Sequence, residues 1–185
     1  LAGMLGVTCG ASPIPFNLIG FTVEPLSAEF GWSRTEIILP ATIYGLIASL
    51  MAPVFGWLAD RYGVRRVALS SVFAFAVALS AVALTPAANT PDTLYFYYGL
   101  WVVIGLVGIG STPVTWSRAV NLWFFKHRGL ALGILLMGTS LAALFVPKLA
   151  VWAIAQFGWR TMFAIMALLP LLVALPVAWL YFREP

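Results

Sequence analysis

The sequence predicts an all-α membrane protein of six transmembrane helices. The chain of 185 residues is 62% hydrophobic and only 9% charged, with a mean hydropathy of +1.00, whereas soluble domains average about 25% charged residues. Its charges fall into short clusters separated by long uncharged runs. These runs approach the roughly 20 residues that an α-helix needs to cross a bilayer, and they lack the two-residue alternation of membrane β-strands.

Six uncharged runs give the expected helices in chain order. They cover residues 1–23, 37–59, 67–91, 93–117, 129–147 and 161–182. The first run is not interpreted as a signal peptide, because no basic residue precedes it and five further runs follow. Prolines inside the runs are expected to bend or break the helices where neighbouring helices satisfy the freed carbonyl groups. These prolines are Pro13, Pro15, Pro40, Pro53, Pro113, Pro147, Pro170 and Pro176.

The distribution of basic residues predicts the orientation in the membrane. The loops after the second, fourth and sixth runs hold Arg61, Arg65, Arg66, Lys126, Arg128 and Arg183. The alternate loops are mainly acidic, with Glu24, Glu29, Glu36 and Asp92 beside Arg34 and Arg160. By the positive-inside rule, the basic loops and both ends of the chain face the cytoplasm. The expected location is the plasma membrane, or the inner membrane if the source is bacterial.

A weak internal repeat suggests two related units. Residues 62–65 (YGVR) have a counterpart 95 positions later at residues 157–160 (FGWR), and each joins the second and third run of a three-run unit. Because three is odd, the second unit is inverted in the membrane, a construction that recurs in secondary transporters. The alternative is that short loops often contain glycine and interfacial aromatic residues. The units would cover about residues 1–88 and 89–185.

The segment 56–66 (GWLADRYGVRR) places one acid and three arginines in a glycine-bounded turn between two uncharged runs. It resembles the loop signature between helices 2 and 3 of the major facilitator superfamily. The resemblance implies a transporter that works by alternating access, with this loop controlling the balance between outward-open and inward-open states. The implied gating residues are Gly56, Asp60, Arg61, Gly63, Arg65 and Arg66.

Physical reasoning adds an expectation for Asp60. It lies at the carboxyl end of the second run, where helix carbonyl groups repel an anion, so it needs cationic or N–H partners. Arg61, Arg65 and Arg66 are close enough in sequence to supply them. The family resemblance implies a further partner, the start of a helix in a second half, with Gly56 allowing the close approach.

Three other segments resemble the monocarboxylate and oxalate/formate branch of the superfamily. They are residues 29–34 (EFGWSR), 123–133 (WFFKHRGLALG) and 157–160 (FGWR). The resemblance covers essentially the whole chain, residues 1–185, as the N-terminal six-helix half of a twelve-helix transporter, and no initiator Met precedes Leu1. Residues 138–143 (GTSLAA) depart from the G-P-x-x-G-G pattern of drug/proton antiporters, which counts against drug efflux.

Charges inside the runs suggest the substrate class. No acid lies well inside a run, and Glu24 at the outer end of the first is the nearest. Arg118 lies eight residues before Lys126, or about 12 Å along a helix, and Lys148 lies well along the expected fifth span, toward its outer face. Charges in the hydrophobic zone are costly and usually functional, and a guanidinium matches a carboxylate. We therefore expect Arg118, Lys148 and Asn17 to contact an organic anion.

Each of these residues also has a structural interpretation. Arg118 would snorkel to the inner headgroups or pair with Asp60 and its neighbours, and Lys148 would anchor the helix at the outer interface. Asn17 would bond a carbonyl group freed by the prolines at positions 13 and 15.

The function expected from the sequence is secondary active transport of a small mono- or dicarboxylate. The alternatives are a self-contained six-span channel or sensor, or a transporter of uncharged or drug-like solutes. One cysteine, Cys9, and one histidine, His127, offer no metal site and no nucleophile–base pair. We expect no enzyme activity, no cofactor and no nucleic-acid partner. The expected partners are the lipid bilayer, a small-molecule substrate and a second six-helix half of the same chain.

Overall fold

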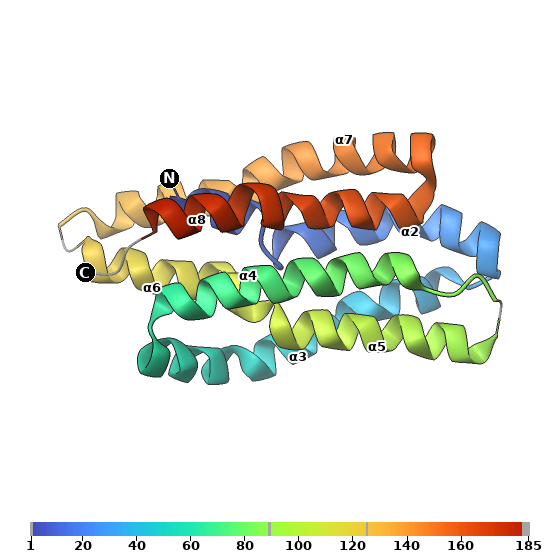
Figure 1. Ribbon diagram of the computed structural model, residues 1–185, viewed down its shortest axis with the longest axis horizontal. Helices are drawn as coiled ribbons and strands as arrows, with labels where there is room; N and C mark the ends of the chain where they lie inside the picture. Colours follow the sequence, from blue (N-terminus) through green and yellow to red (C-terminus); the bar gives the residue numbers. More distant parts are fainter. Residues whose placement is uncertain (1, 89, 125, 183–185) are drawn as a thin grey trace.

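The computed structural model describes residues 2–88, 90–124 and 126–182. Arg183, one of the basic residues that predict the orientation in the membrane, lies outside them. The described residues form helices and turns and contain no strand, so the expected helical class is confirmed. Figure 1 shows an elongated bundle whose helices run roughly along its long axis. In chain order the helices are α1 Ala2–Thr8, α2 Pro13–Phe30, α3 Arg34–Tyr62, α4 Val64–Ala81, η1 Val82–Leu84, α5 Pro91–Val107, η2 Ile109–Ser111, α6 Pro113–Trp123, α7 Arg128–Leu169, the π-helix η3 Pro170–Ala174 and α8 Leu175–Tyr181.

Four helical stretches in the described residues are long and apolar enough to cross a membrane. They are Ala2–Phe30, Arg34–Tyr62, Val64–Leu84 and Arg128–Tyr181. The expected span over residues 93–117 is not among them, because a break divides it into α5, with 17 residues, and α6, with 11. Four stretches of the described residues therefore have membrane-spanning length, whereas the sequence predicts six spans.

The fifth and sixth expected spans fall within one helical stretch, Arg128–Tyr181, and Gly158 marks the boundary between them. The segment Arg128–Leu169 is continuous by its hydrogen bonds, yet Gly158 has a φ of 81° and a ψ of 169°. A positive φ is readily adopted by glycine and costly for other residues. Figure 1 shows the chain turning back at this end of α7, so that the following residues and α8 run back along the bundle. The expected 157–160 loop therefore lies at a reversal of direction inside α7.

The two kinds of loop lie at opposite ends of the bundle. Figure 1 shows the α3–α4 turn, the end of α6, the start of α7 and the end of α8 at one end, and the α2–α3 turn, the end of α4 and the start of α5 at the other. The first end carries the basic residues of segments 61–66 and 126–128, and the charge pattern predicts that these segments share one side.

Prolines do not always interrupt the helices. The helix α3 continues through Pro40 and Pro53.

An ionic and aromatic cluster ties the acidic end together. Glu29, in the last turn of α2, accepts hydrogen bonds from Arg160 Nη1 at 2.7 Å and from Trp159 Nε1 at 2.7 Å. Arg160 also donates through Nη2 to the Thr85 carbonyl at 3.1 Å, and its guanidinium lies 4.3 Å from the Trp159 ring centroid. These contacts join α2, the residue after η1 and the start of the returning part of α7.

Candidate functional site

The candidate site lies toward the basic end of the bundle, where α6 crosses the last turns of α3. Arg118 of α6 donates through Nη1 to the Gly56 carbonyl at 2.6 Å and through Nη2 to Asp60 Oδ2 at 3.0 Å. The Arg118 side chain is 37% exposed and that of Asp60 is 64% exposed. The structure thus brings an expected substrate residue together with two expected gating residues, in the pairing that the structural interpretation of Arg118 anticipated.

Gly56 makes this contact possible. A Cβ atom at position 56 would lie 2.8 Å from Arg118 Nη1, too close for an ordinary contact. Glycine therefore lets the guanidinium reach the backbone of α3. This close approach is made within the described chain, whereas the sequence resemblance implied an approach by a helix of a second half.

The arginines of segment 56–66 have different surroundings. Arg65 Nη2 donates to the Trp179 carbonyl at 2.5 Å, in the last turn of α8, where a cation is favourable. The Arg61 guanidinium lies 5.2 Å from the Trp57 ring centroid and 5.6 Å from that of Tyr62. Arg66 is exposed. Gly63, with a φ of 91°, forms the turn between α3 and α4.

A shallow depression surrounds the Arg118–Asp60 pair. Its volume is about 530 Å³, and it lies between α3 and α6. The lining residues are Ala52, Pro53, Gly56, Trp57, Asp60, Val114, Ser117 and Arg118. The guanidinium is therefore accessible from this face while it remains bonded to α3.

Asn17 and Lys148 lie on other elements. Asn17 Nδ2 donates to the Pro13 carbonyl at 2.7 Å, as expected for an amide that satisfies a carbonyl group next to a proline. Its neighbour Phe16 is 54% exposed, and the Phe16 ring meets the buried Tyr44 ring edge-on at 5.5 Å. Lys148 is exposed on α7, directly after Pro147.

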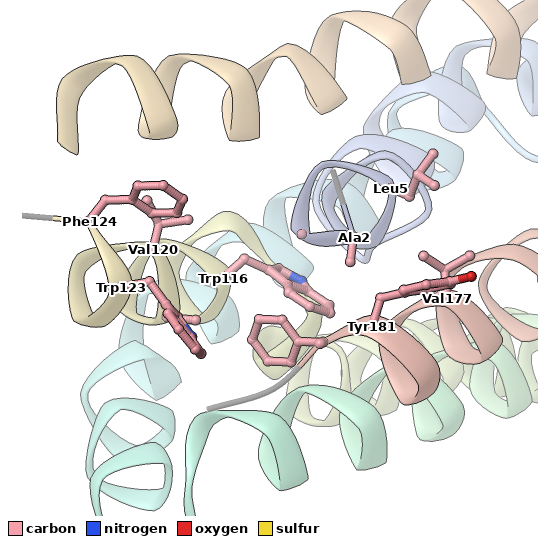
Figure 2. Close-up of a pocket in the computed structure, with 11 residues that line it drawn as sticks. Ala2, Leu5, Trp116, Val120, Trp123, Phe124, Val177 and Tyr181 are labelled. Atoms are coloured by element: carbon pink, nitrogen blue, oxygen red, sulfur yellow. The ribbon is translucent and has the colours of Figure 1, made fainter. Parts of the chain in front are cut away.

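One cavity of the described chain is apolar. It has a volume of about 690 Å³ and lies near the basic end of the bundle, between α1, α6 and α8. Figure 2 shows Trp116, Val120 and Trp123 of α6 facing Val177 and Tyr181 of α8 across it. Its lining residues include no charged side chain.

A buried hydroxyl cluster, which no sequence pattern indicated, lies at the crossing of two broken helices. Ser111 Oγ accepts a hydrogen bond from the Ala11 amide at 3.0 Å, and the Tyr44 hydroxyl donates to the Ala11 carbonyl. Ser71 Oγ donates to the Val107 carbonyl on α5. The prolines at the starts of α2 and α6 were the available signal for the breaks, but nothing in the sequence shows that the breaks touch.

Apolar helices of membrane-spanning length, together with broken helices, are features of an integral membrane transport protein. The sequence profile described as Major Facilitator Superfamily matches residues 5–185. The chain belongs to this superfamily, which is a family of transporters rather than enzymes, and the superfamily expected from segment 56–66 is confirmed.

Curated relatives carry several substrate names. The galacturonate transporter of Dickeya chrysanthemi is 32% identical over 171 residues, which cover 91% of this chain and 46% of the relative. The cis,cis-muconate transport protein of Acinetobacter baylyi is 25% identical, with 88% and 40% covered. A multidrug resistance protein B homolog of Mycobacterium tuberculosis is 26% identical, with 89% and 29% covered. The chain spans less than half the length of each. None of these names identifies the expected monocarboxylate or oxalate/formate branch.

Proposed function

We propose that this chain is one half of a secondary active transporter that moves a small organic anion by alternating access. The observation that carries the proposal is the Arg118 guanidinium, which is 37% exposed and already binds a carboxylate, that of Asp60, at 3.0 Å. Guanidinium groups bind carboxylates through directional, charge-assisted hydrogen bonds. A substrate carboxylate that reaches the depression between α3 and α6 would meet the same donors.

The relatives' names support this substrate class. Galacturonate is a sugar carboxylate and cis,cis-muconate is a dicarboxylate, and proteins named for them are similar to about nine-tenths of this chain. We therefore propose a mono- or dicarboxylate as substrate, including the substrates of the monocarboxylate and oxalate/formate branch that the sequence resembles. Asn17 and Lys148 are proposed as further polar contacts along the path.

The proposed architecture is six passes in two inverted units, about residues 1–88 and 89–185. In this interpretation α1–α2 and α5–η2–α6 are single broken passes, and α7 contains two passes separated by Gly158. The basic end faces the cytoplasm of a plasma or inner membrane. The remaining length of the relatives would correspond to a second six-helix half, and substrate would bind between the halves.

Asp60 and Arg118 give this mechanism a switch. We propose that Arg118 binds Asp60 in one state and a substrate carboxylate in another, while segment 56–66 closes against the second half. A ligand shifts a conformational equilibrium only through contacts that differ between the states. An exchange of carboxylates at one guanidinium supplies such a difference.

A second candidate is transport of apolar, drug-like solutes. Relatives named for multidrug resistance are similar to 89% of this chain, and the cavity of about 690 Å³ in Figure 2 is lined by aromatic and aliphatic side chains. Solutes of this class would not need Arg118.

Uptake by the full-length protein in liposomes tests both candidates. The panel contains radiolabelled galacturonate, cis,cis-muconate, lactate and oxalate, with ethidium as the drug-like probe. We expect uptake of at least one carboxylate, a large loss with Arg118→Ala and Arg118→Lys, and normal uptake with the control Arg34→Lys, whose arginine is exposed at the acidic end. Ethidium transport that survives Arg118→Ala, with no carboxylate uptake, would replace the anion proposal by the second candidate.

A further inference from the structure

Two broken helices share a sequence pattern at their breaks. The first break joins α1 to α2 through Gly10-Ala11-Ser12-Pro13, and the second joins α5 to α6 through Gly110-Ser111-Thr112-Pro113. Both read glycine, small residue, hydroxyl residue, proline, and they are 100 positions apart. Proline cannot donate a backbone hydrogen bond and clashes with the carbonyl four residues earlier, so it starts a helix more readily than it continues one.

The breaks touch each other inside the bundle. The Ala11 amide of the first break donates to Ser111 Oγ of the second at 3.0 Å. A Cβ atom on Gly10 would overlap the Ser111 carbonyl oxygen, so glycine is needed for the backbones to approach this closely. Ala11 and Ser111 are both fully buried. The two helices therefore cross where the α-helical hydrogen bonding of each is interrupted, and in the second break residues 109–111 form a 3-10 turn.

Side chains from α3 and α4, and one from α6 itself, satisfy the backbone groups that the breaks leave open. The Tyr44 hydroxyl of α3 donates to the Ala11 carbonyl, and Ser71 of α4 donates to the Val107 carbonyl. Trp116 Nε1 donates to the Ser111 carbonyl at 3.1 Å. An unsatisfied buried polar group costs about 1–3 kcal/mol. The peptide unit of Ala11 is thus held from both sides, by Ser111 at its N–H side and by Tyr44 at its carbonyl.

The crossing stands between the two parts of the proposed site. Asn17 lies on α2, just after the first break, and its amide bonds the Pro13 carbonyl at 2.7 Å. Arg118 lies on α6, after the second break, where it binds Gly56 and Asp60. A change in angle at either break would move one of these residues relative to the other. Tyr44 also contacts Phe16 through its ring, at 5.5 Å between centroids.

We infer that Ser111 and Tyr44 are positioning residues of a paired hinge, which couples ligand contact on α2 to the Arg118–Asp60 contact on α6 and α3. The inference rests on the proposed transport function. Movement of α2 against the crossing shifts the Ala11 peptide unit, and the Ala11–Ser111 hydrogen bond passes the shift to α6. Removing either hydroxyl loosens the crossing without removing any group that contacts substrate or Asp60.

The test uses the full-length protein with two hinge variants and two matched controls. Ser111→Ala and Tyr44→Phe remove the hydroxyl groups at the crossing. Ser70→Ala removes a hydroxyl that bonds within its own helix, to the Val67 carbonyl at 3.1 Å. Tyr98→Phe removes a tyrosine hydroxyl that bonds the Glu36 carbonyl at 3.0 Å, near the acidic end. Amide hydrogen exchange is measured without ligand over residues 9–12 and 109–112.

We expect exchange in these two segments to be about tenfold faster in both hinge variants and unchanged in both controls. Spin labels at Val54 and Leu122, on α3 and α6, should change their separation when galacturonate or cis,cis-muconate is added to the wild type. In the hinge variants this response should be lost, and the maximal uptake rate should fall about tenfold while the half-saturating concentration changes less than about threefold. A purely structural role would leave the label response to ligand intact.

The two readouts separate this inference from the proposed function. Exchange rates equal to those of the controls would overturn the hinge, whatever the transport result, and so would a preserved label response in variants that exchange faster. Wild-type protein that neither takes up nor responds to any carboxylate would count against the proposed anion function alone, because the exchange measurement needs no ligand.

Discussion

Arg118 and Asp60 are 58 residues apart in sequence, on α6 and α3, and their side chains form an ion pair at 3.0 Å. Both side chains are partly exposed, and ion pairs of this kind contribute only about 0–1 kcal/mol to stability. The pair is therefore poorly explained as a device that stabilises the fold. Its location between two helices, one of them broken, makes a role in conformational balance the better explanation.

The first prediction concerns Asp60→Asn in the full-length protein. The amide cannot form the ion pair with Arg118, so the state in which α3 and α6 are held together should be less populated. We expect slower transport and a shift toward the inward-open state, with little change in equilibrium affinity within the open site. Spin-label distances across the cytoplasmic gate measure the shift, and Asp92→Asn, at the start of α5, is the control. Wild-type distances together with a collapse of substrate binding would place Asp60 in the binding site instead.

The second prediction compares two glycines of α3. Gly45→Ala adds a methyl group with no atom within 4 Å, and alanine favours a helix over glycine by about 0.5–1 kcal/mol, so the variant should be slightly more stable and fully active. Gly56→Ala places its Cβ 2.8 Å from Arg118 Nη1 and should displace the guanidinium. Because the end of a flexible side chain can shift, we expect its uptake to fall less than in Arg118→Ala. Thermal unfolding and uptake are measured side by side, and uptake equal to that of the wild type would mean that the contact with the Gly56 carbonyl is dispensable.

Composition and charge clustering were sufficient to predict a helical membrane protein, because both reflect the apolar solvent around the helices. They were not sufficient to predict where the helices break. Pro40 and Pro53 lie inside a continuous α3, whereas Pro13 and Pro113 each begin a new helix. The difference depends on tertiary contacts, since a break is tolerated where groups such as the Ser111 hydroxyl satisfy the exposed backbone.

The candidate site was predictable in its members, and the pairing of Arg118 with Asp60 was one of the interpretations that the sequence left open. Segment 56–66 and Arg118 stand out as charges between or within apolar runs. Sequence proximity suggested Arg61, Arg65 and Arg66 as partners for Asp60, yet the ion pair in the structure is with Arg118, which is distant in sequence. Arg65 instead reaches the last turn of α8, and no local pattern points to that contact.

The third prediction concerns the cluster at the acidic end. Glu29→Gln removes the charge that receives hydrogen bonds from Arg160 and Trp159, both at 2.7 Å. Hydrogen bonds to charged groups contribute more than neutral ones, so we expect a loss of about 1–2 kcal/mol and a lower melting temperature. Tryptophan fluorescence during thermal unfolding reports the change. Glu24→Gln, on the exposed face of the same helix, is the control and should unfold like the wild type.

The fourth prediction is the orientation of the bundle, which every proposal about the gate assumes. Cys9 is the only cysteine and is buried, so a Cys9→Ala background contains no other thiol that could react during single-cysteine labelling. Thr35→Cys and Arg66→Cys place exposed thiols at the acidic and basic ends of the bundle. The positive-inside rule requires the basic end to stay in the cytoplasm. A membrane-impermeant maleimide added to intact cells should therefore label position 35 strongly, and position 66 only after the membrane is opened. Labelling of position 66 in intact cells would invert the topology and place the Arg118–Asp60 contact at the outer face.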